Sequence, residues 1–225
     1  MRIAILGFGR VGKALVKLVI EKRKYLKHEG IDAQIIYIID INGGIYQQDG
    51  ILDQDLLEVA SIGIPPFQYP YGGSKKITFA TLLEKKDVDV VIEMTPTNKD
   101  TGEPGLTHIK ESLARGLHVI TSNKGPILLA YKSLLELARK NQVQLGIGCT
   151  CGGALPSING GIFDMAGSQI LSIEGVLNGT TNFIINEMDH HGLSYEEGKK
   201  LLGMIAVKNH HNGTLCPKAH FCLLY

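Results

Sequence analysis

Short, nearly unbroken apolar runs alternate with stretches of helical periodicity through the first two thirds of the chain. The run 3–6, for example, precedes Val11, Leu15 and Val19, whose spacing places them on one face of a helix. The pattern predicts strands over residues 3–6, 33–40, 88–94, 117–121 and 143–148, and helices over 10–25, 53–60, 80–86, 105–115 and 130–141. Apolar runs of this kind are typical of parallel strands buried on both faces, so we expect an α/β fold with a doubly wound parallel sheet.

The pattern changes near Cys149. Residues 169–176 alternate with a period of two, which predicts a half-buried strand, and 180–190 have helical character. Ser194 and Glu197 have the spacing of a capping box at the start of a further helix. We therefore expect three parts: a sheet domain over 1–148, an incomplete α+β domain over 149–203, and a divergent tail over 204–225.

Three glycines with the spacing G-x-G-x-x-G occupy the turn between the first strand and the first helix. Gly7 permits the tight turn, Gly9 lets the backbone approach a diphosphate, and Gly12 lets the helix lie close to the strand. Amide groups at the helix N-terminus then face the phosphates, helped by the helix dipole. The motif predicts dinucleotide binding in a Rossmann domain, and the alternative is a tight turn in another α/β protein.

Asp40 ends the second predicted strand, where an acidic side chain accepts hydrogen bonds from the ribose hydroxyls of a dinucleotide. The alternative is an aspartate that caps the next turn. Asp40 would repel a 2′-phosphate, which favours NAD, whereas Arg10 is able to bind one, which favours NADP. The sequence leaves this choice open.

Polar residues follow two later predicted strands, at 95–98 and 122–126. Open α/β sheets bind ligands at the carboxyl ends of their strands, so both segments are candidates for a site. Lys124 is the candidate for chemistry, since a lysine there is able to donate to a substrate oxygen and stabilise charge during hydride transfer. The alternative is an exposed loop lysine.

Composition narrows the class of protein further. The 225 residues carry a net charge of +1, which gives no indication of a nucleic-acid partner or an anionic membrane. We identify no membrane span and no signal peptide, so we expect a cytoplasmic protein with its four cysteines reduced.

Four ordered motifs resemble homoserine dehydrogenase. They are DVVIEMTPTN at 89–98, TGEP at 101–104, HVITSNKGP at 118–126 and GVLNGTTN at 175–182. The similarity extends from Met1 to about Leu202. It implies an enzyme that interconverts L-homoserine and L-aspartate 4-semialdehyde with NAD(P), on the route to threonine and methionine, and that forms a homodimer.

The resemblance also implies roles for individual residues. It assigns the diphosphate to the glycine turn, the nicotinamide end to Thr95 with Pro96, and both the cofactor and the reacting centre to Lys124. Asn178, Gly179 and Thr180 shape the substrate side. The full set of residues expected to bind the cofactor is Gly7, Phe8, Gly9, Arg10, Val11, Gly12, Asp40, Thr95, Pro96 and Lys124.

Two departures from the family pattern affect these expectations. Members often have a glutamate before a loop that binds a sodium ion, and this chain has GCTC at 148–151 instead. The remaining ligands would be the backbone carbonyls of Cys151, Gly153 and Leu155, which predicts weak sodium binding.

The second departure follows Gly203, where the acidic residues and lysine that handle the substrate proton in the family have no counterpart. We expect a truncated or frame-shifted product with weak or absent turnover. The tail is predicted to be disordered or loosely packed. The alternative, a metal cluster, would use His210, His211, Cys216, His220 and Cys222, whose spacing fits no common zinc pattern.

Two other functions remain open at this point. One is a nucleotide-binding fragment without catalysis. The other is a related semialdehyde or imine reductase on the same fold, which the sequence disfavours because it lacks the expected catalytic Cys-His pair or basic motif.

Overall fold

The computed structural model describes residues 1–151, 157–174 and 179–214. Two compact units make up the chain, Met1–Gly160 and Gly161–Tyr225. The first contains the sheet, and the second contains two long helices. Each unit is described below by itself.

A seven-stranded sheet forms the centre of the first unit, in the order β4-β3-β2-β1-β5-β6-β7. The five strands from β2 to β7 in this order are parallel, whereas β3 is antiparallel to β2 and β4 to β3. The strands are β1 (Arg2–Leu6), β2 (Gln34–Asp40), β3 (Gly43–Tyr46), β4 (Gly73–Ser74), β5 (Val90–Glu93), β6 (His118–Thr121) and β7 (Leu145–Gly146). The mostly parallel α/β architecture confirms the predicted fold class.

Helices cover both faces of this sheet. Ala4 and Leu6 in β1 pack into a buried cluster with α3, α4 and α5, and the intervening Ile3 and Ile5 pack into a second cluster with α1 and α2. This alternation is the reason that a nearly continuous apolar strand suits a doubly wound fold. The helices are α1 (Arg10–His28), α2 (Asp53–Ser61), α3 (Phe79–Lys85), α4 (Gly105–Ala114), α5 (Lys124–Lys140) and the short α6 (Ser157–Asn159).

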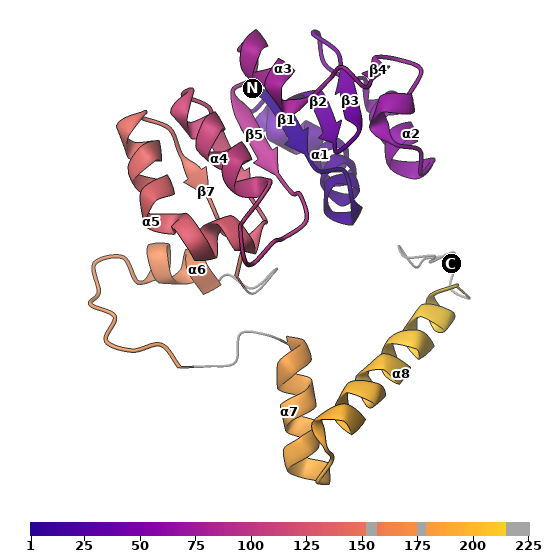
Figure 1. The fold of residues 1–225 in the computed structure, drawn as a ribbon, viewed down its shortest axis with the longest axis vertical. Coiled ribbons are helices and arrows are strands. Elements are labelled where there is room, and N and C mark those ends of the chain that lie inside the picture. Colours follow the sequence, from indigo (N-terminus) through magenta and orange to yellow (C-terminus); the bar gives the residue numbers. More distant parts are fainter. Residues whose placement is uncertain (152–156, 175–178, 215–225) are drawn as a thin grey trace. The chain divides into compact units, whose positions relative to one another are not determined.

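The strand order reverses between β1 and β5, which are adjacent and parallel. From β1 the chain passes to β2 on one side, and later returns to β5 on the other (Figure 1). The loops that follow these two strands therefore diverge and leave a crevice at their carboxyl ends, which is where open α/β sheets bind ligands. The glycine turn and residues 95–98 lie at this point.

Two segments of the first unit differ from the elements that the sequence pattern predicts. Residues 63–76, for which the pattern predicts no helix or strand, contain the 3-10 helix η1 (Pro66–Gln68) and β4. β4 pairs with β3, a strand that the sequence pattern did not indicate. The helix expected from residue 130 is confirmed, because α5 has a kink at Ala130, whose φ of −140° and ψ of 16° are not helical. A further helical segment precedes it from Lys124, where the Asn123 side chain accepts a hydrogen bond from the Gly125 amide and caps the helix.

The regular secondary structure of the second unit is helical over the residues that the structure describes. It contains most of the π-helical turn η2 (Gly160–Asp164), and α7 (Gly179–His191) and α8 (Tyr195–Thr214) pack against each other (Figure 1). The strand expected over 169–176 is wrong over its described part, 169–174, where no strand forms. Leu171 and Ile173 are 87% and 78% exposed there. The capping box is confirmed, since Glu197 accepts from the Ser194 amide at 2.8 Å.

Candidate functional site

The glycine turn is closely packed at its two outer glycines and open at the middle one. Gly7 has φ +90°, and a Cβ there would lie 2.6 Å from the Met94 carbonyl oxygen. A Cβ on Gly12 would lie 2.6 Å from the Gly7 carbonyl oxygen, whereas a Cβ on Gly9 would meet nothing within 4 Å. The turn is therefore fixed against β5 and α1 and leaves space at Gly9 for a ligand to approach the backbone.

A cavity of about 430 Å³, called here the glycine-turn cavity, lies beside this turn. It brings together segments from the ends of β1, β2, β5 and β6. Nine of the predicted cofactor residues line it: Gly7, Phe8, Gly9, Arg10, Val11, Asp40, Thr95, Pro96 and Lys124. Of the predicted set, only Gly12 is not a lining residue, because it packs beneath the turn.

Lys124 lies at the first position of α5, with an exposed side chain. It shares the glycine-turn cavity with Gly9, although 115 positions separate the two in sequence. Lys124 is therefore a helix N-terminal residue on the candidate site, and not the exposed loop lysine that was the alternative.

A buried carboxylate that the sequence analysis missed connects the two strand ends of this site. Glu93 ends β5 and is fully buried. Its Oε1 accepts from the Thr95 amide at 2.9 Å and from the Thr95 hydroxyl, and its Oε2 accepts from the Thr121 hydroxyl at 2.9 Å. No cation forms a salt bridge with Glu93 among the described residues. The only sequence signal for it is an acidic residue at the end of an apolar strand.

Asn123 extends this network to Lys124. Its amide donates to the Thr121 hydroxyl oxygen at 2.9 Å, and its side-chain Nδ2 donates to the Thr95 carbonyl at 3.2 Å. The same side chain caps α5, the helix that begins with Lys124. Thr95 and Lys124, which both line the glycine-turn cavity, are thus held by one network of hydrogen bonds.

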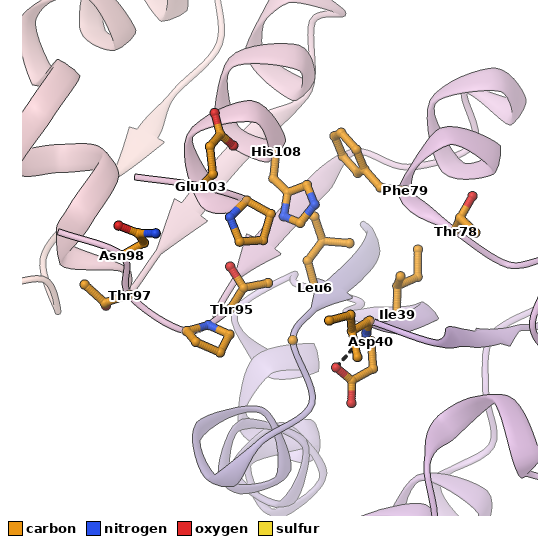
Figure 2. A pocket seen from close by; sticks show the side chains of 14 residues that line it. Leu6, Ile39, Asp40, Thr78, Phe79, Thr95, Thr97, Asn98, Glu103 and His108 are labelled. Carbon is orange, nitrogen blue, oxygen red and sulfur yellow. Dashed lines mark hydrogen bonds between the residues drawn. The ribbon is translucent and has the colours of Figure 1, made fainter. Parts of the chain in front are cut away.

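A second cavity of about 640 Å³, the His108 cavity, adjoins the end of β2 (Figure 2). His108 and Phe79 lie together at its wall, with ring centroids 4.5 Å apart. Burial lowers the pKa of His108, although Glu93 and Glu103 oppose this shift. The His108 ring is therefore neutral at pH 7.

Asp40 lines both cavities, and its side chain is exposed. Its Oδ1 accepts from the Ile41 amide at 2.8 Å, so the capping interaction weighed from the sequence is present. That interaction occupies one of the two carboxylate oxygens. The geometry leaves the other available to a ligand, because no described residue donates to it.

Some predicted residues lie outside the described part of the chain. Asn178, Gly153 and Leu155 belong to this group, while Gly179 and Thr180 begin α7. The Cys151 carbonyl accepts from the Ser157 hydroxyl at 3.0 Å. The sodium site and the substrate-side roles stay predictions.

The described residues contain neither a metal-binding cluster nor a membrane-spanning helix. They contain no group of three or more His, Cys, Asp or Glu residues placed to hold a metal ion. No helix among them combines the length and the apolar character that crossing a membrane requires. Residues 215–225 of the predicted tail lie outside that part of the chain, so the metal cluster weighed for the tail stays an open alternative.

The family model, the sequence relatives and the solved structures that resemble this chain are all homoserine dehydrogenases. The sequence model of the family described as homoserine dehydrogenase matches residues 156–200. The homoserine dehydrogenase of Methanocaldococcus jannaschii is 40% identical over 200 residues. This chain is a homologue of the homoserine dehydrogenases. The alignment covers 89% of this chain and 59% of that relative, so the chain spans about six tenths of its length.

Other homoserine dehydrogenases are similar to this chain in sequence or in fold. The NAD(+)-dependent homoserine dehydrogenase of Pseudomonas canavaninivorans is 33% identical, over 87% of this chain and 56% of its own. A candidate homoserine dehydrogenase from Archaeoglobus fulgidus has a TM-score of 0.77 at 30% identity, covering 92% of this chain and 60% of that one. A hyperthermophilic archaeal homoserine dehydrogenase mutant in complex with NADPH has a TM-score of 0.76 at 26% identity, covering 92% and 61%. The resemblance inferred from the four motifs is confirmed.

Proposed function

We propose that this chain binds NAD(P) in the glycine-turn cavity and interconverts L-homoserine and L-aspartate 4-semialdehyde. The observation that supports this most is the presence of Lys124 and the glycine turn on one cavity. A dinucleotide-binding turn alone would support many functions. A lysine on the same cavity, at the start of α5, adds a group suited to a reaction at a substrate oxygen.

The residues at the turn fit a dinucleotide. Gly9 leaves open space, and beside it lies the N-terminus of α1, which is the end of a helix that attracts phosphate oxygens. The cofactor, when bound, supplies the hydride acceptor or donor. Lys124 would then donate a hydrogen bond to the substrate oxygen and stabilise negative charge on it as hydroxyl and carbonyl interconvert.

Further features of the proposal come from the family rather than from the geometry. Asn178, Gly179 and Thr180 would shape the substrate side, and the cofactor is NAD or NADP, as in the named relatives. We also propose a cytoplasmic location, a homodimer, and a role in making threonine and methionine.

The proposal is tested by L-homoserine oxidation with NAD or NADP, followed through the absorbance of the reduced cofactor. Lys124→Ala is expected to lower kcat by about 10²- to 10³-fold, the usual cost of removing a donor that stabilises negative charge on a reacting oxygen. Lys132→Ala is the matched control, because Lys132 is also exposed on α5 but lies on neither cavity. It should leave kcat unchanged.

Equal kcat in wild type and Lys124→Ala would contradict the proposed role of the lysine. Saturable NADH binding by wild type without any homoserine-dependent turnover would instead support the nucleotide-binding fragment. Absence of binding by the folded chain would contradict both functions.

A further inference from the structure

We infer that Asn123 is a positioning residue, which sets where the Lys124 amine lies relative to Thr95. The inference rests on the proposed function, because it concerns how Lys124 is held for that reaction. Asn123 is 1% exposed and lines neither cavity, so it acts only through its neighbours. Of these neighbours, Thr95 lines both cavities and Lys124 lines the glycine-turn cavity.

The position of the Lys124 amine depends on the backbone of α5. The side chain is exposed, and no described residue forms a hydrogen bond or an ion pair with it. Because its four-carbon stem is flexible, only the backbone limits where the amine reaches. A reacting group that is misplaced by about 1 Å costs about 10²-fold in rate. The contacts that hold the first turn of α5 therefore bear directly on the reaction.

The two ends of the Asn123 side chain bind different elements. Oδ1 accepts from the Gly125 amide at 3.3 Å, which ties it to the start of α5. Nδ2 donates to the Thr95 carbonyl at 3.2 Å and to Glu93 Oε1 at 3.5 Å, at the end of β5. Turning the amide over would place its oxygen against two acceptors and its NH₂ group against a donor. The partners therefore fix one orientation, which links β5 to the residues on both sides of Lys124.

The segment between β5 and α4 covers this link. Gly105 is the first residue of α4, and a Cβ there would lie 2.6 Å from Asn123 Nδ2. A Cβ on Gly125 would lie 2.3 Å from the carbonyl oxygen of Asn98. Both glycines are buried. The first turn of α5 is therefore enclosed between residues 98–105 and the end of β5, with no room to shift towards α4.

Helix capping alone does not require asparagine at position 123. Serine caps a helix about as well, because its hydroxyl oxygen also accepts from an amide of the first turn. A serine has no NH₂ group for the Thr95 carbonyl and the Glu93 carboxylate, and its hydroxyl lies closer to the backbone than Nδ2 does. Asn123→Ser therefore keeps the cap of α5 and removes the link to β5.

The test measures the acetylation of Lys124 by acetic anhydride, with and without saturating NADH, by peptide mass spectrometry. In wild type, NADH should slow this acetylation, because the proposed site places the nicotinamide beside the amine. Asn123→Ser should lose most of the protection while the dissociation constant for NADH stays unchanged, since the diphosphate binds at the glycine turn. Lys132 is the internal reference, because it is exposed on α5 and lines neither cavity. NADH should not change its acetylation.

Turnover gives a second readout. For each NADH-binding site, Asn123→Ser should lower kcat for homoserine oxidation by about 10- to 100-fold, as expected for a misplaced reacting group. A residue that only stabilises the fold would behave differently. Its loss would lower the number of sites that bind NADH and leave kcat per site unchanged.

Gly105→Ala tests the same link from α4. The added Cβ would press on Asn123 Nδ2, so this variant should lose the protection of Lys124 as Asn123→Ser does. Gly203→Ala is the matched control, because Gly203 lies on α8 and an added Cβ there meets nothing within 4 Å. It should keep the protection seen in wild type. Circular dichroism checks that each variant is folded.

The outcomes separate this inference from the proposed function. Equal protection of Lys124 in wild type and Asn123→Ser would overturn the inference and leave the proposed function intact. NADH binding without any protection of Lys124 in wild type would instead overturn the proposed role of the lysine. Absence of NADH binding by the folded chain would overturn the proposed function itself.

Discussion

At the scale of single residues, the three glycines of one motif have different tasks. Gly12 and Gly7 have no room for a side chain, because backbone carbonyls occupy the space. Gly9 has room and an extended backbone with φ −78°, which any residue adopts, so the fold does not require glycine there. A requirement for glycine at position 9 would come from a ligand.

This division predicts different stabilities for two alanine variants. Gly12→Ala gains up to about 1 kcal/mol in helix propensity but meets the Gly7 carbonyl at 2.6 Å, and overpacking costs about 1–3 kcal/mol. We expect a net loss in the free energy of unfolding. Gly9→Ala should stay within about 0.5 kcal/mol of wild type. Urea unfolding measures both, and a greater loss in Gly9→Ala than in Gly12→Ala would contradict this account of the turn.

Glu93 gives a second prediction for a single residue. The contacts described above present only donors to its two carboxylate oxygens. Glu93→Gln would direct an NH₂ group at one of those donors, and an unsatisfied buried group costs about 1–3 kcal/mol. The same substitution should lower homoserine-dependent turnover, because Thr95 and Asn123 lose the group that connects them.

Glu111→Gln is the matched control for this prediction. Glu111 forms an i,i+4 ion pair with Arg115 on the surface of α4, with side chains 40% exposed. Such pairs contribute about 0–1 kcal/mol, so the control should be nearly neutral. A Glu93→Gln variant as stable and as active as this control would show that the network does not organise the site.

At the scale of elements, the strands of the parallel sheet were predictable because burial on both faces requires unbroken apolar runs. β3 was not, because two of its four residues are glycine. A Cβ at Gly43 would lie 2.6 Å from the Ser74 carbonyl oxygen, so the close approach of β4 explains this glycine. This contact forms only in the folded chain, so the sequence pattern around Gly43 did not indicate a strand.

Two other segments differ from the elements predicted for them. In one a helix starts earlier than predicted, and in the other no neighbouring strand pairs with the predicted strand. The segment around Lys124 lies outside the helix predicted over 130–141, although proline is tolerated in a first helical turn after an Asn cap. Residues 169–174 alternate like a strand, but alternation stabilises a strand only when another strand pairs with it. The residues that line the glycine-turn cavity were predictable from motifs, whereas the buried Glu93 network depends on contacts between β5 and β6.

The start of α8 provides a prediction for pH dependence. Hydrogen bonds from the Ser194 hydroxyl and amide lower the pKa of Glu197 below its ordinary value. A lowered pKa means that the interaction stabilises the helix start fully above the ordinary glutamate pKa. The stabilisation is lost as the pH falls through the lowered value.

Carboxyl chemical shifts in an NMR titration of the full chain measure this directly. Ser194→Ala should raise the pKa of Glu197 towards its ordinary value, because the hydroxyl donor is removed. The neighbouring Glu196 serves as an internal reference, since it pairs with Lys199 rather than with Ser194. An unchanged Glu197 pKa in Ser194→Ala would contradict the capping box.

At the scale of the whole molecule, every residue that lines the two cavities belongs to the first unit, Met1–Gly160. The proposed dinucleotide site therefore depends on the reversal of strand order between β1 and β5 and on the network that joins β5 to β6. The substrate side is assigned to residues 178–180 by resemblance alone. We propose that one cavity holds the cofactor diphosphate at the glycine turn and the nicotinamide beside Lys124.

A crystal structure of the chain with NADH tests this claim most directly. We predict the diphosphate against the backbone N–H groups at the start of α1, the adenosine ribose hydroxyls on Asp40, and the nicotinamide ring next to the Lys124 amine. A cofactor bound with its nicotinamide in the His108 cavity, or bound away from the glycine turn altogether, would contradict the account.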